Sequence, residues 1–220
     1  MKLSLAPHSE LEADLRRRIC ALELPPGTPL SRPELLREYG VSSTPLRDAL
    51  MQLQADRLVV VQPQSGTMVS LIDLDHARQI HLMRSAAEQE AAAIAAARPN
   101  PALADEIGQI VVLSAEMLAR QQMDGFARLD LAFHDALFRA AALPEIRRII
   151  RRESGHIDRL RALHLMQPQK AREIIADHSA IATAIREGRP DAARAAMGKH
   201  LSQSIQIGAQ LRGLHPHYFT

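Results

Sequence analysis

Cysteine is almost absent from the 220 residues, because Cys20 is the only one. A single cysteine forms no intrachain disulfide and excludes every zinc site that is built from several cysteines. A metal site in this chain would therefore use histidine and carboxylate ligands.

Long hydrophobic runs are also missing. No apolar stretch approaches the roughly 20 residues that a membrane-spanning helix needs. The first residues, MKLSLAPHSELEADLRRR, reach proline, histidine and acids before the apolar core of a signal peptide could form. We therefore expect a soluble, cytoplasmic protein with no membrane partner.

A strong net charge is absent as well. Residues 1–73 carry eight Lys and Arg against nine Asp and Glu, and residues 74–220 carry 19 against 16, which leaves a net charge of +2. Neither part is broadly basic. A prediction of nucleic-acid binding must therefore rest on local geometry.

The chain divides into two parts of different texture. Residues 1–72 mix short helical patterns with one β-rich stretch, whereas residues 73–212 are Ala-rich and have helical periodicity. Proline and glycine interrupt the second part often enough to predict about six helices, each of about 15 to 25 residues. Asp73 is the expected N-cap of the first of them, so we place the domain boundary there and set residues 213–220 apart as a tail.

The first part predicts three helices followed by a β-hairpin. The helices cover about residues 9–22 and 32–39 and then a stretch that begins after the N-cap Ser42, with Gly40 ending the second. Two β-rich runs flank a turn at 63–66. This order is typical of a winged helix-turn-helix. The predicted fold is mainly α, with an N-terminal winged helix-turn-helix and a C-terminal all-α helical bundle.

In a winged helix-turn-helix, the N-terminal residues of the second helix of the pair meet base edges in the major groove. Those positions are Ser42, Ser43, Thr44 and Arg47. Arg47 can make a bidentate contact to guanine, and the hydroxyls can bond phosphates or bases. The alternative is a small three-helix unit in which the arginine is exposed only for solvation.

The stretch GVSSTPLRDALMQLQADRLVVVQPQSGTMV resembles the GntR family of bacterial transcription regulators, and the likeness extends over residues 9–70. The resemblance implies that Thr44 and Arg47 contact DNA, that Gly66 lies at the tip of the wing, and that a dimer binds a pseudo-palindromic operator. Two positions depart from the family pattern. Ser43 stands where arginine is usual, and Pro33 stands where a basic residue is common, so Arg32 is the candidate replacement.

Histidine and aspartate occur inside apolar helical patterns of the second part. In LDLAFHDALF, the spacing of Asp130 and His134 puts both on one face of a helix. His178 and His200 lie on or beside the apolar stripes of two further helices. Three histidines and one aspartate suit a divalent ion of borderline softness, such as Zn, Ni, Mn or Fe, with coordination positions left for water or a ligand.

Each of these residues also has an ordinary interpretation. A single histidine on an apolar face is more often a hydrogen-bonded core residue than a metal ligand. Asp130 and His134 can also pair with each other along their helix.

Residues 73–211 are similar to the FCD ligand-binding domain of the FadR branch of GntR regulators. Metal-binding members have Asp-x-x-x-His on one helix, His on a second and His on the last, and this chain fills all four positions. The resemblance implies a divalent metal cofactor, zinc before the other three, held by Asp130, His134, His178 and His200.

Arg84 shares the apolar face of the first helix of this part. An arginine that faces the core needs an anion, and a small carboxylate effector held at the open metal positions would provide one. The alternative, given equal weight, is a surface ion pair with Glu88. The remaining histidines are assigned to the surface or to the surroundings of the metal: His76, His81, His156, His164, His215 and His217.

The predicted function is a ligand-responsive transcription regulator, a homodimer whose affinity for double-stranded operator DNA is modulated by a small organic acid at the metal. A metal-dependent enzyme domain fused to a DNA-binding head is the alternative, because such a site can also activate water. No further Glu or His falls in an evident general-base position, so we predict that the protein is not an enzyme.

Overall fold

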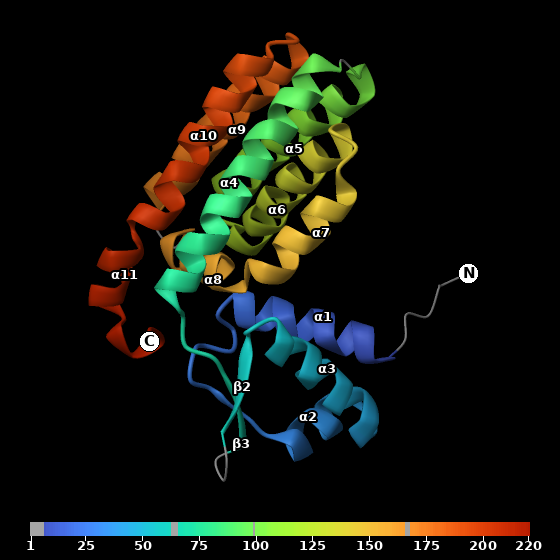
Figure 1. Cartoon of the computed structure of the whole chain (residues 1–220), viewed down its shortest axis with the longest axis vertical. Helices are drawn as coiled ribbons and strands as arrows, with labels where there is room; N and C mark the ends of the chain where they lie inside the picture. Colours follow the sequence, from blue (N-terminus) through green and yellow to red (C-terminus); the bar gives the residue numbers. More distant parts are fainter. Residues whose placement is uncertain (1–6, 63–65, 99, 166–167) are drawn as a thin grey trace.

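The computed structural model of the chain describes residues 7–62, 66–98, 100–165 and 168–220, and for 7, 8, 165, 168 and 203–206 it describes the backbone only. Figure 1 shows a small mixed domain beneath a longer helical bundle, with the last helix of the chain beside the junction of the two. None of the helices in these described ranges is long and apolar enough to cross a membrane.

The N-terminal domain follows the predicted order of three helices and a hairpin, with one added strand. Its antiparallel sheet has the order β1-β3-β2, and β1 and β2 flank β3, with Pro29 and Val60 both opposite Met68. The sequence pattern does not predict β1, because two residues are too short to show alternation. The elements are α1 (Pro7–Cys20), β1 (Pro29–Leu30), α2 (Arg32–Tyr39), α3 (Ser43–Ala55), β2 (Val59–Gln62) and β3 (Gly66–Val69).

The core of this domain comes from the predicted apolar stripes. Leu15 and Ile19 of α1 and Leu53 of α3 are fully buried against one another's helices. Gly40 ends α2 with a left-handed backbone, φ +62°, which glycine adopts without steric cost. The turn at Gly40 sets α3 against α1 and α2. The first turn of α3, with Ser43 and Thr44, stays exposed.

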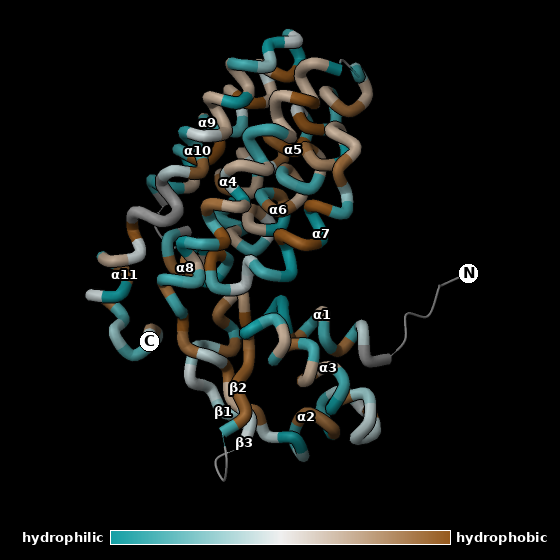
Figure 2. Tube along the Cα trace, viewed as in Figure 1, coloured by the Kyte–Doolittle hydropathy of each residue, from teal (hydrophilic) through white to brown (hydrophobic). Residues whose placement is uncertain are grey.

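The C-terminal domain is a bundle in which α4, α5, α6, α9 and α10 run side by side as its long helices (Figure 1). Figure 2 shows hydrophobic and hydrophilic residues alternating along these helices, as amphipathic packing requires. The chain forms more helices than the predicted six, because it is also interrupted at Ser154 and at Ile207. The helices are α4 (Leu74–Ala97), α5 (Pro101–Ala119), α6 (Met123–Ala140), α7 (Pro144–Glu153), α8 (Gly155–Leu165), α9 (Pro168–Arg186), α10 (Pro190–Gln206), α11 (Gly208–Leu214) and the 3-10 turn η1 (Pro216–Tyr218).

The N-cap of α4 is the predicted Asp73. Its Oδ1 accepts hydrogen bonds from the backbone N–H groups of Asp75 and His76, both at 2.9 Å. These bonds satisfy two of the free N–H groups at the start of the helix. The long α4 therefore begins directly after the linker from β3.

The end of the chain packs back on this linker. Ile72 and Phe219 form a parallel β-bridge, in which the Ile72 N–H donates to the Tyr218 carbonyl at 2.7 Å and the Thr220 N–H donates to the Ile72 carbonyl at 3.1 Å. Phe219 is 5% exposed. Residues 213–220, which the sequence sets apart as a tail, thus cover the junction between the two domains.

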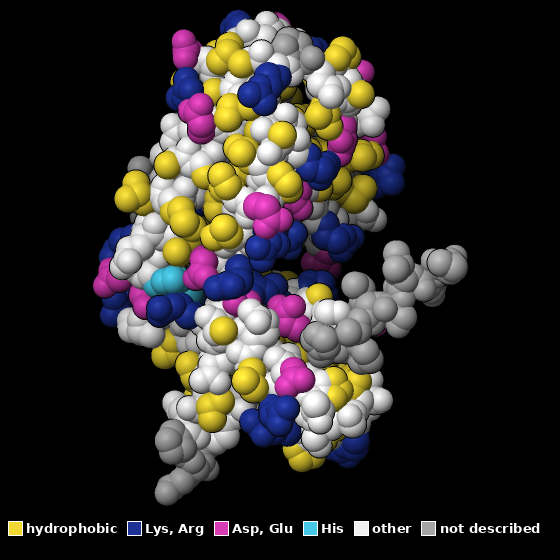
Figure 3. All heavy atoms as spheres, turned by 45° about the vertical axis from the view of Figure 1, so that its right-hand side comes forward, with side chains coloured by type: hydrophobic (Ala, Val, Ile, Leu, Met, Phe, Trp, Pro, Cys, Tyr) yellow, Lys and Arg dark blue, Asp and Glu magenta, His cyan; other side chains and the backbone are white. Residues whose placement is uncertain are grey.

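The junction is also rich in buried polar groups. His156, at the start of α8, is 3% exposed and its Nδ1 accepts the Asp73 N–H at 2.9 Å. The assignment of His156 to the surface or to the surroundings of the metal is therefore wrong, because burial against the linker is a tertiary contact that no helical pattern shows. Figure 3 shows Lys and Arg side chains gathered at this junction between the two domains, among Asp and Glu side chains.

Candidate metal centre and nucleic-acid interface

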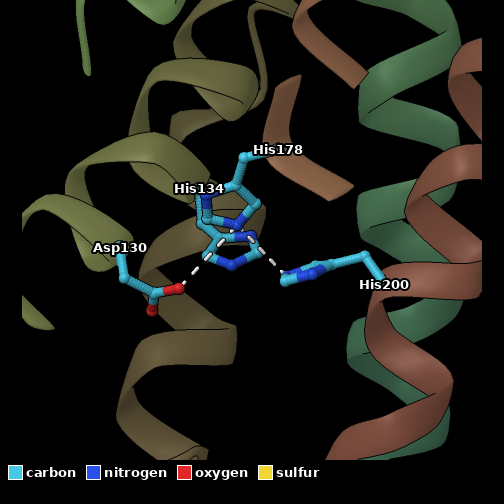
Figure 4. Close-up of side chains that lie close together, drawn as sticks. All are labelled: Asp130, His134, His178 and His200. Atoms are coloured by element: carbon cyan, nitrogen blue, oxygen red, sulfur yellow. Dashed lines mark hydrogen bonds and ion pairs between the residues drawn. The ribbon is translucent and has the colours of Figure 1, made fainter. Parts of the chain in front are cut away.

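Four side chains from three helices meet inside the bundle (Figure 4). Asp130 and His134 come from α6, His178 from α9 and His200 from α10, and all four are buried. One ligand atom of each lies within 4.8 Å of the others. The spacing of Asp130 and His134 on one uninterrupted helix puts both on its inner face, as predicted.

The atoms at the centre are those that bind metals. His178 Nε2 lies 3.2 Å from His200 Nε2 and 3.8 Å from Asp130 Oδ1. Phe133, beside His134 in sequence, stacks on the His178 ring with centroids 3.7 Å apart and an interplanar angle of 7°. This stacking holds the His178 ring in one plane, so its Nε2 stays directed at the cluster.

Asp130 divides its two oxygens between two neighbours. Oδ2 accepts a hydrogen bond from the Arg161 guanidinium of α8. Oδ1 is buried and has no hydrogen-bond partner among the described residues. An unpartnered buried carboxylate oxygen is costly, so its position facing the histidines favours a bound cation.

Glu88 of α4 also reaches the cluster. Its Oε2 lies 2.6 Å from His134 Nδ1, and its Oε1 accepts from Arg84 Nε at 2.7 Å. Glu88 is fully buried and Arg84 is 2% exposed. The alternative pairing of Arg84 with Glu88 is therefore the one that the structure forms, but as a buried pair and not as a surface pair.

Arg84 is thus already neutralised by a protein carboxylate, and its Nη2 lies 3.2 Å from His134 Nε2. Glu88 lies beside the ligand His134, but its two oxygens are engaged by His134 and Arg84. The i,i+4 spacing of Arg84 and Glu88 on an apolar face was the sequence signal for their ion pair. The contact with His134 could not be predicted, because it depends on how α4 packs against α6.

Two further residues support the cluster and leave no pattern in the sequence. Asp177 of α9 places Oδ2 3.8 Å from His200 Nδ1, while its Oδ1 accepts from Lys199 Nζ at 2.9 Å. Arg161 lies among other charged residues of α8, so nothing in the sequence singles it out. Carboxylates beside the second ring nitrogen of a histidine orient the ring and raise its basicity as a ligand.

The protonation states in the cluster suit metal binding. Burial lowers the pKa of His134 to about 4, although Glu88 acts in the opposite direction, and burial together with the nearby His200 ring lowers the pKa of His178 well below its ordinary value. Burial acts to raise the pKa of Asp130, but Arg161 and the histidines outweigh it and keep the pKa below its ordinary value. Neutral imidazole and ionised carboxylate are the forms that bind a metal.

The cluster therefore fits a divalent ion. Zinc binds imidazole nitrogen at about 2.0 to 2.1 Å, so two ligands on opposite sides of one ion lie about 4 Å apart. The ligand atoms lie within 4.8 Å of one another, so the side chains would draw in slightly around an ion. Three histidines and one carboxylate would fill four positions, and an ion that takes five or six ligands would keep one or two positions open.

The residues predicted to meet DNA are all on the surface. Ser42, Ser43, Thr44 and Arg47 are exposed at the start of α3, where Arg47 Nη2 lies 3.2 Å from Asp48 Oδ1. Arg32 is exposed at the start of α2. Gly66 is exposed at the first position of β3, with φ +86°, a left-handed backbone that favours glycine. Residues 63–65 of the predicted turn lie outside the described residues.

Comparisons with known proteins agree on both domains. The family model for bacterial regulatory proteins of the gntR family matches residues 7–69, and the FCD domain model matches residues 79–203. The chain is 32% identical over 208 residues to an HTH-type transcriptional regulator in an unstable DNA locus of Streptomyces ambofaciens, which covers 94% of this chain and 86% of that protein. It is 28% identical over 206 residues to the HTH-type transcriptional repressor RspR of Escherichia coli K12, with 94% and 90% covered.

Solved structures show the same fold. McbR/YncC of Escherichia coli aligns with a TM-score of 0.83 at 20% identity, covering 94% of this chain and 99% of that chain. A GntR protein from Rhodococcus sp. RHA1 aligns with a TM-score of 0.73 at 21% identity, covering 94% and 97%.

Fold and relatives together define a DNA-binding regulator of transcription, and not an enzyme. The chain belongs to the GntR family, with an FCD domain as its C-terminal part.

Proposed function

We propose that this protein binds a pseudo-palindromic operator as a homodimer, and that a small organic acid held at a divalent metal in the FCD domain modulates its DNA affinity. The observation that carries the proposal is the convergence of Asp130, His134, His178 and His200 from three helices in one buried cluster. A regulator that works on DNA would act in the cytoplasm.

DNA reading is assigned to the exposed start of α3. Arg47 is the residue that would read a base, and Ser42, Ser43 and Thr44 would bond phosphates or bases. Arg32, at the start of α2, and Gly66, at the wing, are further candidate contacts. The exposure of all six residues supports this assignment.

A homodimer follows from the size of one recognition helix. One half-site offers too few contacts for a specific site to compete with a genome, so two copies are needed. Large hydrophobic side chains are exposed on α4 (Leu82 and Met83) and on α7 (Ile146 and Ile149), two helices that pack together. Figure 3 shows hydrophobic side chains over the face of the bundle that is turned forward. We assign this α4–α7 face to contact with a second copy.

The effector would bind where the metal leaves coordination positions open. A divalent ion supplies positive charge and open positions to a carboxylate oxygen. Arg84 of α4 places its Nη2 3.2 Å from His134 Nε2, and its charge is balanced by Glu88. We therefore assign Arg84 to effector binding, with Glu88 holding its side chain in place.

The deciding experiment measures metal and acid binding together. Protein purified without chelator should contain about one divalent ion per chain, with zinc expected before nickel, manganese or iron, and His178→Ala or His200→Ala should lose most of it. His217→Ala changes an exposed histidine outside the cluster and should keep the ion. Calorimetry with a panel of small mono-, di- and tricarboxylates should detect binding to metal-loaded protein only.

The metal site would be excluded if the purified protein held no metal and if the His178→Ala and His200→Ala variants were as stable as the wild type. These residues would then be ordinary core histidines. Turnover of an acid by the metal-loaded protein would instead favour the enzyme alternative.

A further inference from the structure

Helix α8 touches both the metal cluster and the linker between the domains. Arg161 donates to Asp130 Oδ2 in the cluster, and Arg159 Nη1 donates to the Ser70 carbonyl at the end of β3, at 2.6 Å. Two positions apart on a helix, these arginines leave it in nearly opposite directions. One short helix thus joins a candidate metal ligand to the start of the linker.

On the linker side, Arg159 is fully buried and bonds only neutral acceptors among the described residues. Besides the Ser70 carbonyl, it donates to Ser70 Oγ at 3.3 Å, to His156 Nδ1 at 3.1 Å and to the Gly155 carbonyl at 3.2 Å. Burial lowers the pKa of Arg159 to about 10, so it is still charged at neutral pH. A buried charge held by so few acceptors is costly to leave without them, so Ser70 must follow α8 if α8 moves.

The first turn of α8 holds the rest of the linker and the DNA-binding domain. His156 Nδ1 accepts the Asp73 N–H, at the N-cap of α4. A Cβ atom on Gly155 would lie 2.5 Å from Leu58 Cδ2, so the helix approaches the start of β2 as closely as glycine permits. Leu58 is fully buried at this contact.

On the cluster side, the link passes through one carboxylate. Asp130 Oδ1 faces the histidines, at 3.8 Å from His178 Nε2, while Oδ2 is bound by Arg161. The two side chains are 3% and 11% exposed, so water competes little for their ion pair. A cation bound by the histidines would attract Oδ1 and fix the position of the carboxylate. Because Oδ2 of the same carboxylate accepts from Arg161, the position of Arg161 would be fixed as well.

We propose that α8 transmits occupancy of the metal cluster to the DNA-binding domain, along the path from Asp130 through Arg161 and Arg159 to Ser70. The inference rests on the proposed function, because a metal must occupy the cluster. An ion that fixes Asp130 would also fix Arg161 and α8. The hydrogen bonds of the linker, residues 70–73, then open less often.

Paths outside α8 also join the domains and must be distinguished from it, and one of them is the chain end after α10, which pairs with Ile72 of the linker. Arg152 of α7 lies 3.5 Å from Asp56 Oδ1, at the C-cap of α3, and Arg147 of the same helix lies 3.8 Å from Glu88. Helix α4 itself runs from the linker to Glu88. If one of these paths carried the signal, loss of the α8 contacts would leave the signal intact.

The test is amide hydrogen exchange of residues 70–73 in the full chain, metal-free and with zinc chloride as the probe. Zinc should slow exchange of the Ser70, Ile72 and Asp73 amides about 5-fold or more in the wild type, the low end of usual coupling between sites. Arg159→Met, which leaves the cluster untouched, should still bind zinc by calorimetry but lose most of this slowing. Arg161→Met removes a partner of Asp130 and so is measured at saturating zinc, where it should lose most of the slowing as well. Arg159→Lys keeps one donor for the Ser70 carbonyl and should retain part of it.

Arg152→Met is the matched control, since it removes an arginine between the domains that lies outside the α8 path, and it should keep the full effect. If Arg159→Met fails to fold, Arg161→Met and Arg159→Lys carry the test. Zinc binding with unchanged linker exchange, or slowing that survives in Arg161→Met, would overturn the α8 path alone. A wild-type protein that binds no zinc would overturn the proposed function and this path with it.

Discussion

Arg47 is the single residue on which sequence-specific DNA binding should depend most. If its guanidinium reads a guanine, Arg47→Ala should lose about 1 to 3 kcal/mol of binding to an operator obtained by site selection, and less on a random duplex at low salt. Titration of both duplexes by fluorescence anisotropy measures the difference. Arg194→Ala, which changes a partly exposed arginine of α10, is the control and should bind both as the wild type does. Equal losses on both duplexes would mean that Arg47 touches only phosphate.

His156 should make stability depend on pH. Burial, with Arg159 next in effect, lowers its pKa from 6.5 to about 3 in the folded protein. Between these values the unfolded chain binds the extra proton, so the free energy of unfolding should fall as pH falls below 6.5, by at most about 1.4 kcal/mol per pH unit for one group.

The matched variant is His156→Gln, which keeps an acceptor for the Asp73 N–H but does not titrate. Urea unfolding of metal-free protein over this pH range should give a shallower slope for the variant, because the buried His134 and His178 contribute equally to both proteins. The same slope in both would show that His156 is not the group that titrates.

At the scale of helices, one ion would tie α6, α9 and α10 together. Removing it with a chelator should lower the melting temperature by about 5 to 10 °C, the shift expected when a ligand at 100 times its Kd is lost from a chain of this size. Differential scanning calorimetry measures the change. His178→Ala should melt at a temperature that chelator no longer alters, whereas His217→Ala should respond as the wild type does. A chelator effect that persists in His178→Ala would place the ion elsewhere.

Prediction from sequence succeeded for helices whose pattern is local. The buried stripe of Leu46, Leu50 and Leu53 in α3 follows from spacing alone, and so does the cap at Asp73, because both depend on residues within one or two turns. It failed for β1 and for the break before α8. Strand β1 exists only because β3 lies beside it, and the break at Ser154 lets Gly155 approach Leu58.

At the scale of the whole molecule, the prediction is a two-fold dimer. Light scattering at micromolar concentration should give twice the chain mass of 24.3 kDa. A charge placed in the α4–α7 face, as in Ile149→Glu, should weaken the dimer, because it would be desolvated between the copies. Val112→Glu alters a similarly exposed hydrophobic residue on α5 and should leave the mass unchanged. A monomer with and without DNA would contradict the proposed mode of operator binding.

The sequence by itself determined what depends on local order. Helical periodicity, caps and glycine turns specify the winged helix-turn-helix and the bundle, and the four-residue spacing of Asp130 and His134 puts them on one face. The positions of His178 and His200 on or beside apolar stripes suggested that they join this pair, and a family resemblance favoured that over ordinary core histidines.

Tertiary structure alone decided which groups surround the cluster and how it joins the DNA-binding domain. Glu88 meets His134, Arg161 meets Asp130, and Arg159 meets Ser70 across 89 positions of sequence. Such contacts depend on how whole helices pack, and a buried polar group takes whichever partner that packing brings within reach. A single sequence carries the periodicity of each helix, but it does not carry the angles and offsets at which the helices meet.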